Sequence, residues 1–188
     1  MHSRFVCHLS KARRIAGAVA VIALLSACTK PATVEELYPK LALTSVDGTQ
    51  TSIEAFRGKL LVLNVWATWC PPCRREMPSL ERLSKTVDRN RIVVAGLSVD
   101  NDANAVLEFL VQTGVTFRNF RDTPGNIINA LDVQVYPETL LIAPDGKLVH
   151  RILGERDWSS PVMLRVLEEA YQGRRSELDQ SLAGALAP

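Results

Sequence analysis

The feature that most constrains this chain is a pair of cysteines, Cys70 and Cys73, separated by two prolines. Two cysteines at this spacing can form a disulfide that closes a small ring. The apolar run 60–66 before the pair is typical of a strand, and an amphipathic run follows it. This order places the first sulfur at a helix N-terminus, where the backbone dipole favours a thiolate. The pattern indicates a redox centre that exchanges disulfides with other proteins.

Two other uses of a cysteine pair are less consistent with the sequence. A structural cross-link that closes about four residues would add only roughly 2 kcal/mol in the chain-entropy model, against ~3 kcal/mol for a fifteen-residue loop. A zinc site would need two further ligands. Without the leader described next, the chain keeps His150 as its only histidine. We therefore expect a redox-active disulfide between Cys70 and Cys73, with no metal and no other cofactor.

Residues 1–27 have the pattern of a signal peptide: a basic start, then an apolar run over 15–27. Such a run rises only about 20 Å as a helix, too short for a bilayer core of ~30 Å. It ends in Leu25-Ser26-Ala27-Cys28, which resembles the lipobox of bacterial lipoproteins. That resemblance implies cleavage before Cys28 and a lipid on its sulfur. An ordinary signal peptide and an uncleaved anchor are the alternatives.

Removal of the leader changes the charge of the chain. The full sequence of 188 residues has 22 Lys and Arg against 20 Asp and Glu, and four of the basic residues lie in the leader. The mature chain therefore carries 18 against 20, and no basic patch indicates nucleic acid binding. Its length suits one domain, in a compartment where disulfides persist.

The remainder divides into a tether over 28–40, a domain over 41–172 and a flexible tail over 173–188. Asp47-Gly48, between two short strand-like runs, predicts a hairpin. Further strands are expected over 60–66, 91–99, 115–120, 138–143 and 147–153. Helices are expected after Cys70, after a cap at Asp100 or Asn101, over 124–132, and after a cap at Ser159 or Ser160. This order predicts an α/β fold with a mixed central sheet flanked by helices.

The run from Val65 to Pro78, VWATWCPPCRREMP, closely resembles the TlpA/ResA/DsbE-type thioredoxin-like proteins. Tyr136-Pro137-Glu138-Thr139 is similar to the second half of that fold, and the Asp47-Gly48 region to its added N-terminal β-hairpin. The resemblance covers about residues 38–172. It implies a thioredoxin-like fold and an exported, membrane-associated disulfide reductase. Proteins of this type often serve cytochrome c maturation and receive electrons from a membrane thiol reductase.

The chemistry of such a centre assigns a different role to each sulfur. Cys70 is the expected attacking thiolate, which forms a mixed disulfide with a client, and Cys73 is the expected resolving thiol. The direction of exchange depends on the reduction potential, which the sequence does not give. Pro71 and Pro72 remove two N–H donors near the sulfur and stiffen the turn.

The surroundings of the pair supply candidate client-binding residues. By resemblance to the thioredoxin fold, Pro137 is expected to be cis, which exposes the backbone of Tyr136 for pairing with a client segment. Trp69, Pro71 and Pro72 are expected to border the same surface. An ordinary trans proline at the start of a strand is the alternative for Pro137.

Asn64 departs from the thioredoxin pattern, in which a buried Asp at the matching position assists proton transfer at the second cysteine. Asn cannot accept that proton. Glu138 is our candidate acceptor for Cys73, and a solvated strand-end carboxylate is the alternative. We expect residues 74–76 to form a solvated helix face.

Three rival functions stay open at this point. A thiol peroxidase would resemble proteins with Thr or Ser three residues before the cysteine, where this chain has Ala67. A copper chaperone would need a histidine ligand, for which only His150 is available. An oxidase or isomerase would use the same centre in the other direction. We expect a monomer in the periplasm, lipid-anchored, and Thr29 after the lipidated cysteine favours the outer membrane.

Overall fold

The computed structural model describes residues 41–122 and 126–185. The expected signal peptide, lipidation site and tether therefore lie outside the described residues.

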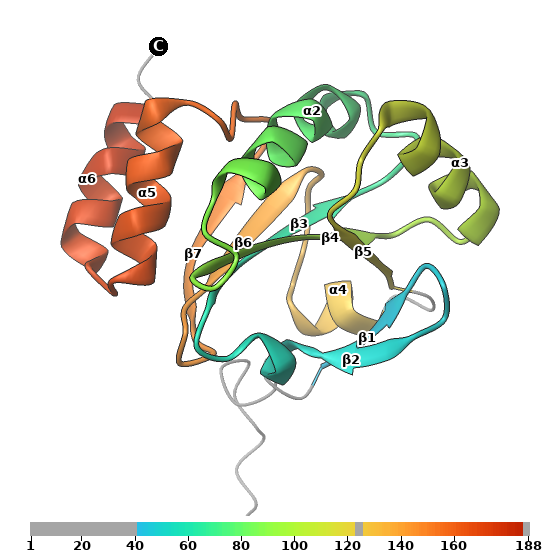
Figure 1. Cartoon of the computed structure of the whole chain (residues 1–188), viewed down its shortest axis with the longest axis horizontal. Helices are drawn as coiled ribbons and strands as arrows, with labels where there is room; N and C mark the ends of the chain where they lie inside the picture. Colours follow the sequence, from blue (N-terminus) through green and yellow to red (C-terminus); the bar gives the residue numbers. More distant parts are fainter. Residues whose placement is uncertain (1–40, 123–125, 186–188) are drawn as a thin grey trace, which may run out of the picture. The chain divides into compact units, whose positions relative to one another are not determined.

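A seven-stranded sheet forms the centre of the fold, in the order β2-β1-β5-β4-β3-β6-β7 (Figure 1). Its strands are β1 (Ala42–Ser45), β2 (Gln50–Ser52), β3 (Leu60–Trp66), β4 (Ile92–Ser98), β5 (Arg118–Arg121), β6 (Glu138–Ile142) and β7 (Leu148–Leu153). Strands β3, β4 and β5 are parallel, and the other neighbours are antiparallel. The predicted mixed sheet is confirmed.

Helices cover both faces of this sheet (Figure 1). The helices on the face that carries the redox helix are α2 (Pro71–Thr86), α3 (Ala103–Thr113), α5 (Pro161–Tyr171) and α6 (Arg175–Ala185). The opposite face is covered by the short helices η2 (Ile53–Phe56) and α4 (Asn126–Ala130). Two separate hydrophobic clusters result, one on each side of the sheet.

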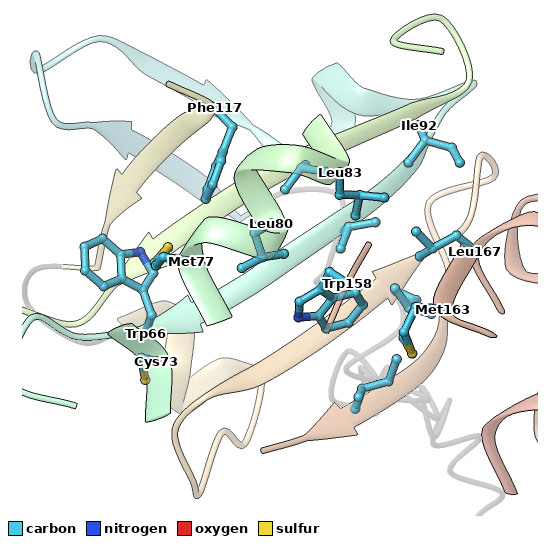
Figure 2. Close-up of a cluster of buried hydrophobic side chains, with 14 of the residues drawn as sticks. Trp66, Cys73, Met77, Leu80, Leu83, Ile92, Phe117, Trp158, Met163 and Leu167 are labelled. Carbon is cyan, nitrogen blue, oxygen red and sulfur yellow. The ribbon is translucent and has the colours of Figure 1, made fainter. Parts of the chain in front are cut away.

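Strand β3 lies in the middle of the sheet, and all seven of its residues are buried. Its side chains alternate between the clusters: Leu60 and Val62 face α2, whereas Leu61 and Leu63 face the other side. Figure 2 shows the α2 side, where apolar side chains of the helix lie beside Trp66 and Trp158. This burial on both faces holds the strand that leads into the cysteine pair.

The N-terminal hairpin is present as the sequence predicted. β1 and β2 pair antiparallel, with Thr44 opposite Gln50. Gly48 adopts a φ of +87° in the turn, and its N–H donates to the Ser45 carbonyl at 2.9 Å. Only glycine adopts such a φ without strain.

The C-terminal segment differs from the flexible tail that we expected over 173–188. Residues Arg175–Ala185 form α6, whose Leu178 and Leu182 are almost fully buried in the α2-side cluster. Two leucines one turn apart give little periodicity in the sequence. They are nevertheless enough to hold the helix, because α5 offers an apolar face to cover.

The start of α3 also differs from expectation. Its N-cap is Asp102, whose carboxylate accepts from the Asn104 N–H at 2.8 Å. Asp100 and Asn101, the predicted caps, precede it. Asp100 is therefore available for the contacts with the redox loop that are described below.

Candidate active site

Cys70 and Cys73 form a disulfide at the junction between β3 and α2, with an S–S distance of 2.06 Å. Cys70 is the N-cap of α2, and the next two residues are prolines without an N–H. The Cys73 N–H donates to the Cys70 sulfur at 3.3 Å. Once the disulfide is reduced, this donor and the helix dipole favour the thiolate of Cys70.

The two sulfurs differ in their access to solvent. Cys73 is fully buried, whereas Cys70 retains 4% of its surface. In Figure 2, Cys73 lies at the edge of the α2-side cluster. The small exposed surface of the pair thus belongs to Cys70, and its role as the attacking sulfur stays a prediction.

Two aromatic side chains from distant parts of the chain meet beside the disulfide. Trp69 is 63% exposed, and its ring contacts that of Tyr136 edge-on, with centroids 5.8 Å apart. The Tyr136–Pro137 peptide bond is cis, as the resemblance implied. Val135 next to them is also exposed. These residues form an apolar rim, and its role in client binding stays a prediction.

Glu76 lies one helical turn after Cys73, and the prediction that it is solvated is wrong. Only 2% of its surface is exposed. Its Oε1 accepts from the Asn64 amide at 2.7 Å, and its Oε2 accepts from the Trp158 indole N–H at 3.0 Å. The Arg156 backbone N–H adds a third donor at 3.1 Å. The side chain of Glu76 faces β3 because of its position on the helix. The sequence does not indicate this, because the neighbouring Arg74 and Arg75 make the run look solvated.

Burial raises the pKa of Glu76 from 4.5 to about 7. The donors from Trp158, Asn64 and Arg156 act in the opposite direction, because they favour the ionised carboxylate, and the nearby charge of Glu155 adds to the rise. A carboxyl group with a pKa near neutrality can both accept and release a proton under ordinary conditions. Perturbed groups of this kind gather at functional sites.

Asn64 connects this carboxylate to the sheet. Its Nδ2 donates to Glu76 and also to the Thr139 hydroxyl, at 2.9 Å. Its Oδ1 is buried and has no hydrogen-bond partner among the described residues. Asn64 replaces the buried Asp of thioredoxins, and an acid on α2 occupies the same network. The presence of Asn instead of Asp at position 64 was the signal in the sequence that another residue must supply the acid near the cysteine pair.

Glu138, the acceptor predicted from the sequence, is 2% exposed and forms an ion pair with Arg151 of β7. The alternative of a solvated carboxylate is therefore wrong. Arg151 also donates to the Leu131 carbonyl. Glu138 pairs with Val65 and shares a face of β6 with Leu140, two residues further on, whose side chain lies in the cluster opposite α2. Its side chain and that of Glu76 thus lie on different faces of the sheet, and its role in proton transfer stays a prediction.

The described residues contain no group of three or more His, Cys, Asp or Glu that could hold a metal ion. His150 is half-buried on β7, with its Nδ1 3.8 Å from a carboxylate oxygen of Asp179 on α6. Within the same described residues, no helix has the length and apolar character to span a membrane.

Comparison with known proteins identifies the group to which this arrangement belongs. The family model described as Redoxin matches residues 31–168. The chain belongs to the redoxin family. The thiol-disulfide oxidoreductase ResA of Bacillus thuringiensis subsp. konkukian is 33% identical over 118 residues, which cover 63% of this chain and 68% of that protein. This likeness supports the TlpA/ResA/DsbE-type resemblance seen in the sequence.

Solved structures share the fold of this redoxin. A thiol:disulfide interchange protein of the thioredoxin family from Chlorobium tepidum TLS has a TM-score of 0.61 and 26% identity, covering 70% of this chain and 92% of that one. The exposed lipoprotein thioredoxin of Streptococcus pneumoniae strain TIGR4 has a TM-score of 0.57 and 23% identity, covering 69% and 98%. With its disulfide-forming pair, this redoxin is a thiol-disulfide oxidoreductase.

The burial of Glu76 predicts a pH-dependent stability. Its carboxyl binds a proton more tightly in the folded chain, so the free energy of unfolding falls as pH rises from about 4.5, the unfolded pKa, to about 7, the folded pKa. Between these pH values we expect the wild type to lose about 3 kcal/mol more than Glu76→Gln. Urea unfolding of the oxidised protein across this range measures the difference. The exposed Glu54→Gln variant should keep the wild-type slope, and a wild-type curve parallel to that of Glu76→Gln would contradict the assignment.

Proposed function

We propose that this redoxin reduces disulfides of exported client proteins through Cys70 and Cys73. The observation that carries the proposal is the asymmetry of the pair: the Cys70 sulfur caps α2 and keeps a small exposed surface, whereas Cys73 is fully buried, one helical turn before Glu76. The first arrangement suits a nucleophile, and the second suits a thiol that must lose its proton only after a client is bound.

The exchange begins with the reduced pair. The Cys70 thiolate attacks one sulfur of the client disulfide, a Cys70–client bond forms, and the client's other sulfur leaves as a thiolate that takes up a proton. Cys73 then loses its proton and attacks the Cys70 sulfur. The client's remaining sulfur leaves, takes up a proton, and the Cys70–Cys73 disulfide closes. Two electrons pass to the client, and a dithiol donor returns the pair to its reduced form.

The second step needs a base for the buried Cys73 thiol. We assign this task to Glu76, because it lies on the same helix one turn away and its pKa of about 7 suits proton uptake near neutral pH. Glu138 is the competing candidate from the sequence. Its carboxylate is held by Arg151 and lies on the other sheet face, which favours Glu76.

The client is expected to bind across the apolar rim. Trp69 and Tyr136 would contact its side chains, and the backbone next to Pro137 would pair with an extended client segment. Pro71 and Pro72 border the sulfur on the helix side.

The sequence outside the described residues supports a periplasmic, membrane-anchored location for this activity. The apolar run 15–27 and the Leu25–Cys28 motif favour export to the periplasm and a lipid on Cys28, with Thr29 favouring the outer membrane. A membrane thiol reductase would supply electrons, and cytochrome c maturation proteins are among the expected clients. We do not extend the proposal to a peroxidase or a copper chaperone, since Ala67 and His150 carry no observation that favours either.

Substitution of the resolving cysteine should trap the client. With Cys73→Ser, the mixed disulfide between Cys70 and a client cannot be resolved, so it should accumulate and disappear on treatment with a reductant. Non-reducing gels with a disulfide-bonded model substrate measure this product. Cys70→Ser is the matched control, because its remaining sulfur is buried. Equal trapping by both variants, or by neither, would overturn the assigned order of attack.

The two candidate bases can be distinguished by their effect on the rate at which Cys73 resolves the mixed disulfide and releases the client. We expect Glu76→Gln to slow release of the client about tenfold to a hundredfold and to remove the inflection near pH 7, because the base is lost. Glu138→Gln should leave that pH profile in place. Stopped-flow measurement of product release from the mixed disulfide distinguishes them. If only Glu138→Gln loses the inflection, the sequence-based candidate is the acceptor.

Anchoring depends on the sulfur of Cys28. When the full chain is expressed in a bacterium with lipoprotein processing, we expect the wild type in the membrane fraction and Cys28→Ser in the soluble periplasmic fraction or unprocessed. Thr29→Ser is the control and should stay with the membrane. Fractionation with mass measurement of the N-terminus tests this. A wild-type protein that is cleaved elsewhere and carries no lipid would exclude the anchor.

A further inference from the structure

Asp100 is a buried carboxylate two residues after the end of β4, and the exchange reaction proposed above assigns it no role. Only 6% of its surface is exposed. Its Oδ2 accepts from the Thr68 backbone N–H at 2.9 Å and from the Ser98 hydroxyl at 2.7 Å. Its Oδ1 accepts from the Thr68 hydroxyl at 2.6 Å. Three donors thus converge on one carboxylate, and two of them come from a single residue.

Thr68 belongs to the short loop that joins β3 to the redox helix. The same loop contains a turn in which the Cys70 N–H donates to the Ala67 carbonyl at 3.2 Å. Trp69, the exposed residue of the apolar rim, lies between Thr68 and Cys70. Because Asp100 holds both the backbone and the hydroxyl of Thr68, it fixes the loop that presents Trp69 and the attacking sulfur.

The carboxylate also places a negative charge at the residue two positions before the reacting cysteine. Asp100 Oδ2 lies 2.9 Å from the Thr68 nitrogen, and the Cα atoms of Thr68 and Cys70 are at most about 7.6 Å apart, so this oxygen lies within about 12 Å of the Cys70 Cα. A negative charge at such a distance disfavours the thiolate of the reduced pair, whereas the disulfide is neutral. The charge therefore favours the oxidised pair, which makes the reduced pair a stronger donor of electrons.

We propose that Asp100 is a positioning residue for disulfide exchange, which holds the Ala67–Trp69 loop and whose charge makes the Cys70–Cys73 couple more reducing. The inference rests on the proposed reductase function and gives it a physical cause. Asp100 has no capping role at α3, because Asp102 is the N-cap of that helix.

Other charged residues around this loop have partners of their own, including the buried Asp122 just after β5, which accepts from the Ile127 and Ile128 N–H groups. Arg74 lies over the ring of Phe109 at 5.6 Å, and Asp102 caps α3. Arg121 of β5 donates to the Asn101 carbonyl at 2.8 Å. None of these contacts involves Asp100, so we expect them to persist when position 100 is changed.

Two substitutions separate the charge from the hydrogen bonds. Asp100→Asn removes the charge and keeps the shape. Thr68→Val keeps the charge and removes the hydroxyl bond, and Thr68→Ser is its control because it keeps both bonds. All three are close in size to the native residue. Urea unfolding of each variant verifies that it is folded before its redox properties are compared.

We expect Asp100→Asn to shift the equilibrium with glutathione about threefold to tenfold toward the dithiol, and to lower the pKa of the Cys70 thiol in the reduced chain. Thr68→Val should leave that equilibrium within about twofold and reduce kcat/KM for a model client disulfide about threefold to tenfold. Thr68→Ser should match the wild type in both measurements.

The outcomes distinguish this inference from the function on which it rests. An Asp100→Asn variant with the wild-type equilibrium and thiol pKa would overturn the role of the charge. A Thr68→Val variant with the wild-type kcat/KM would overturn the positioning role. If the wild-type protein itself exchanges no disulfide with glutathione, the proposed function fails instead.

Discussion

The buried carboxyl of Glu76 is the interaction on which the arrangement of the site depends. It joins three separate parts of the chain: the redox helix, strand β3 through Asn64, and the segment before α5 through Arg156 and Trp158. Burial of an ionised carboxylate costs several kcal/mol, and three donors offset part of that cost. The remainder raises its pKa to about 7, so the group that holds the helix in place is also ready to exchange a proton.

Two other carboxylates hold the two loops that carry Trp69 and Tyr136, whose rings are in contact. Asp100 fixes the loop that carries Trp69, and Glu138 binds Arg151, which also holds the Leu131 carbonyl at the start of the loop toward Tyr136. The edge-on contact between the two aromatic rings requires both loops to keep their places. Each half of the rim is thus anchored by a buried carboxylate, Asp100 just after β4 and Glu138 on β6.

The parts predicted from the sequence are those that local patterns determine. The buried run 60–66, the Asp47-Gly48 turn and the spacing of the cysteines predicted β3, the hairpin and the disulfide, because each depends on neighbouring residues. The burial of Glu76 and the bonds of Asp100 could not be predicted in this way. Both depend on partners about thirty to eighty residues away, and both acids stand in runs that look polar.

The reducing or oxidising character of such a centre is a balance between local and distant contributions. The motif itself favours the thiolate, through the helix N-terminus and the Cys73 N–H. The fold opposes it, through the charge of Asp100 near the loop and the burial that surrounds Cys73. Two proteins can therefore share the same four-residue motif and differ in the direction of disulfide exchange. The contributions that disfavour the thiolate come from residues that the motif does not include. The potential of this couple therefore depends on residues of the fold outside the cysteine motif as well as on the motif itself.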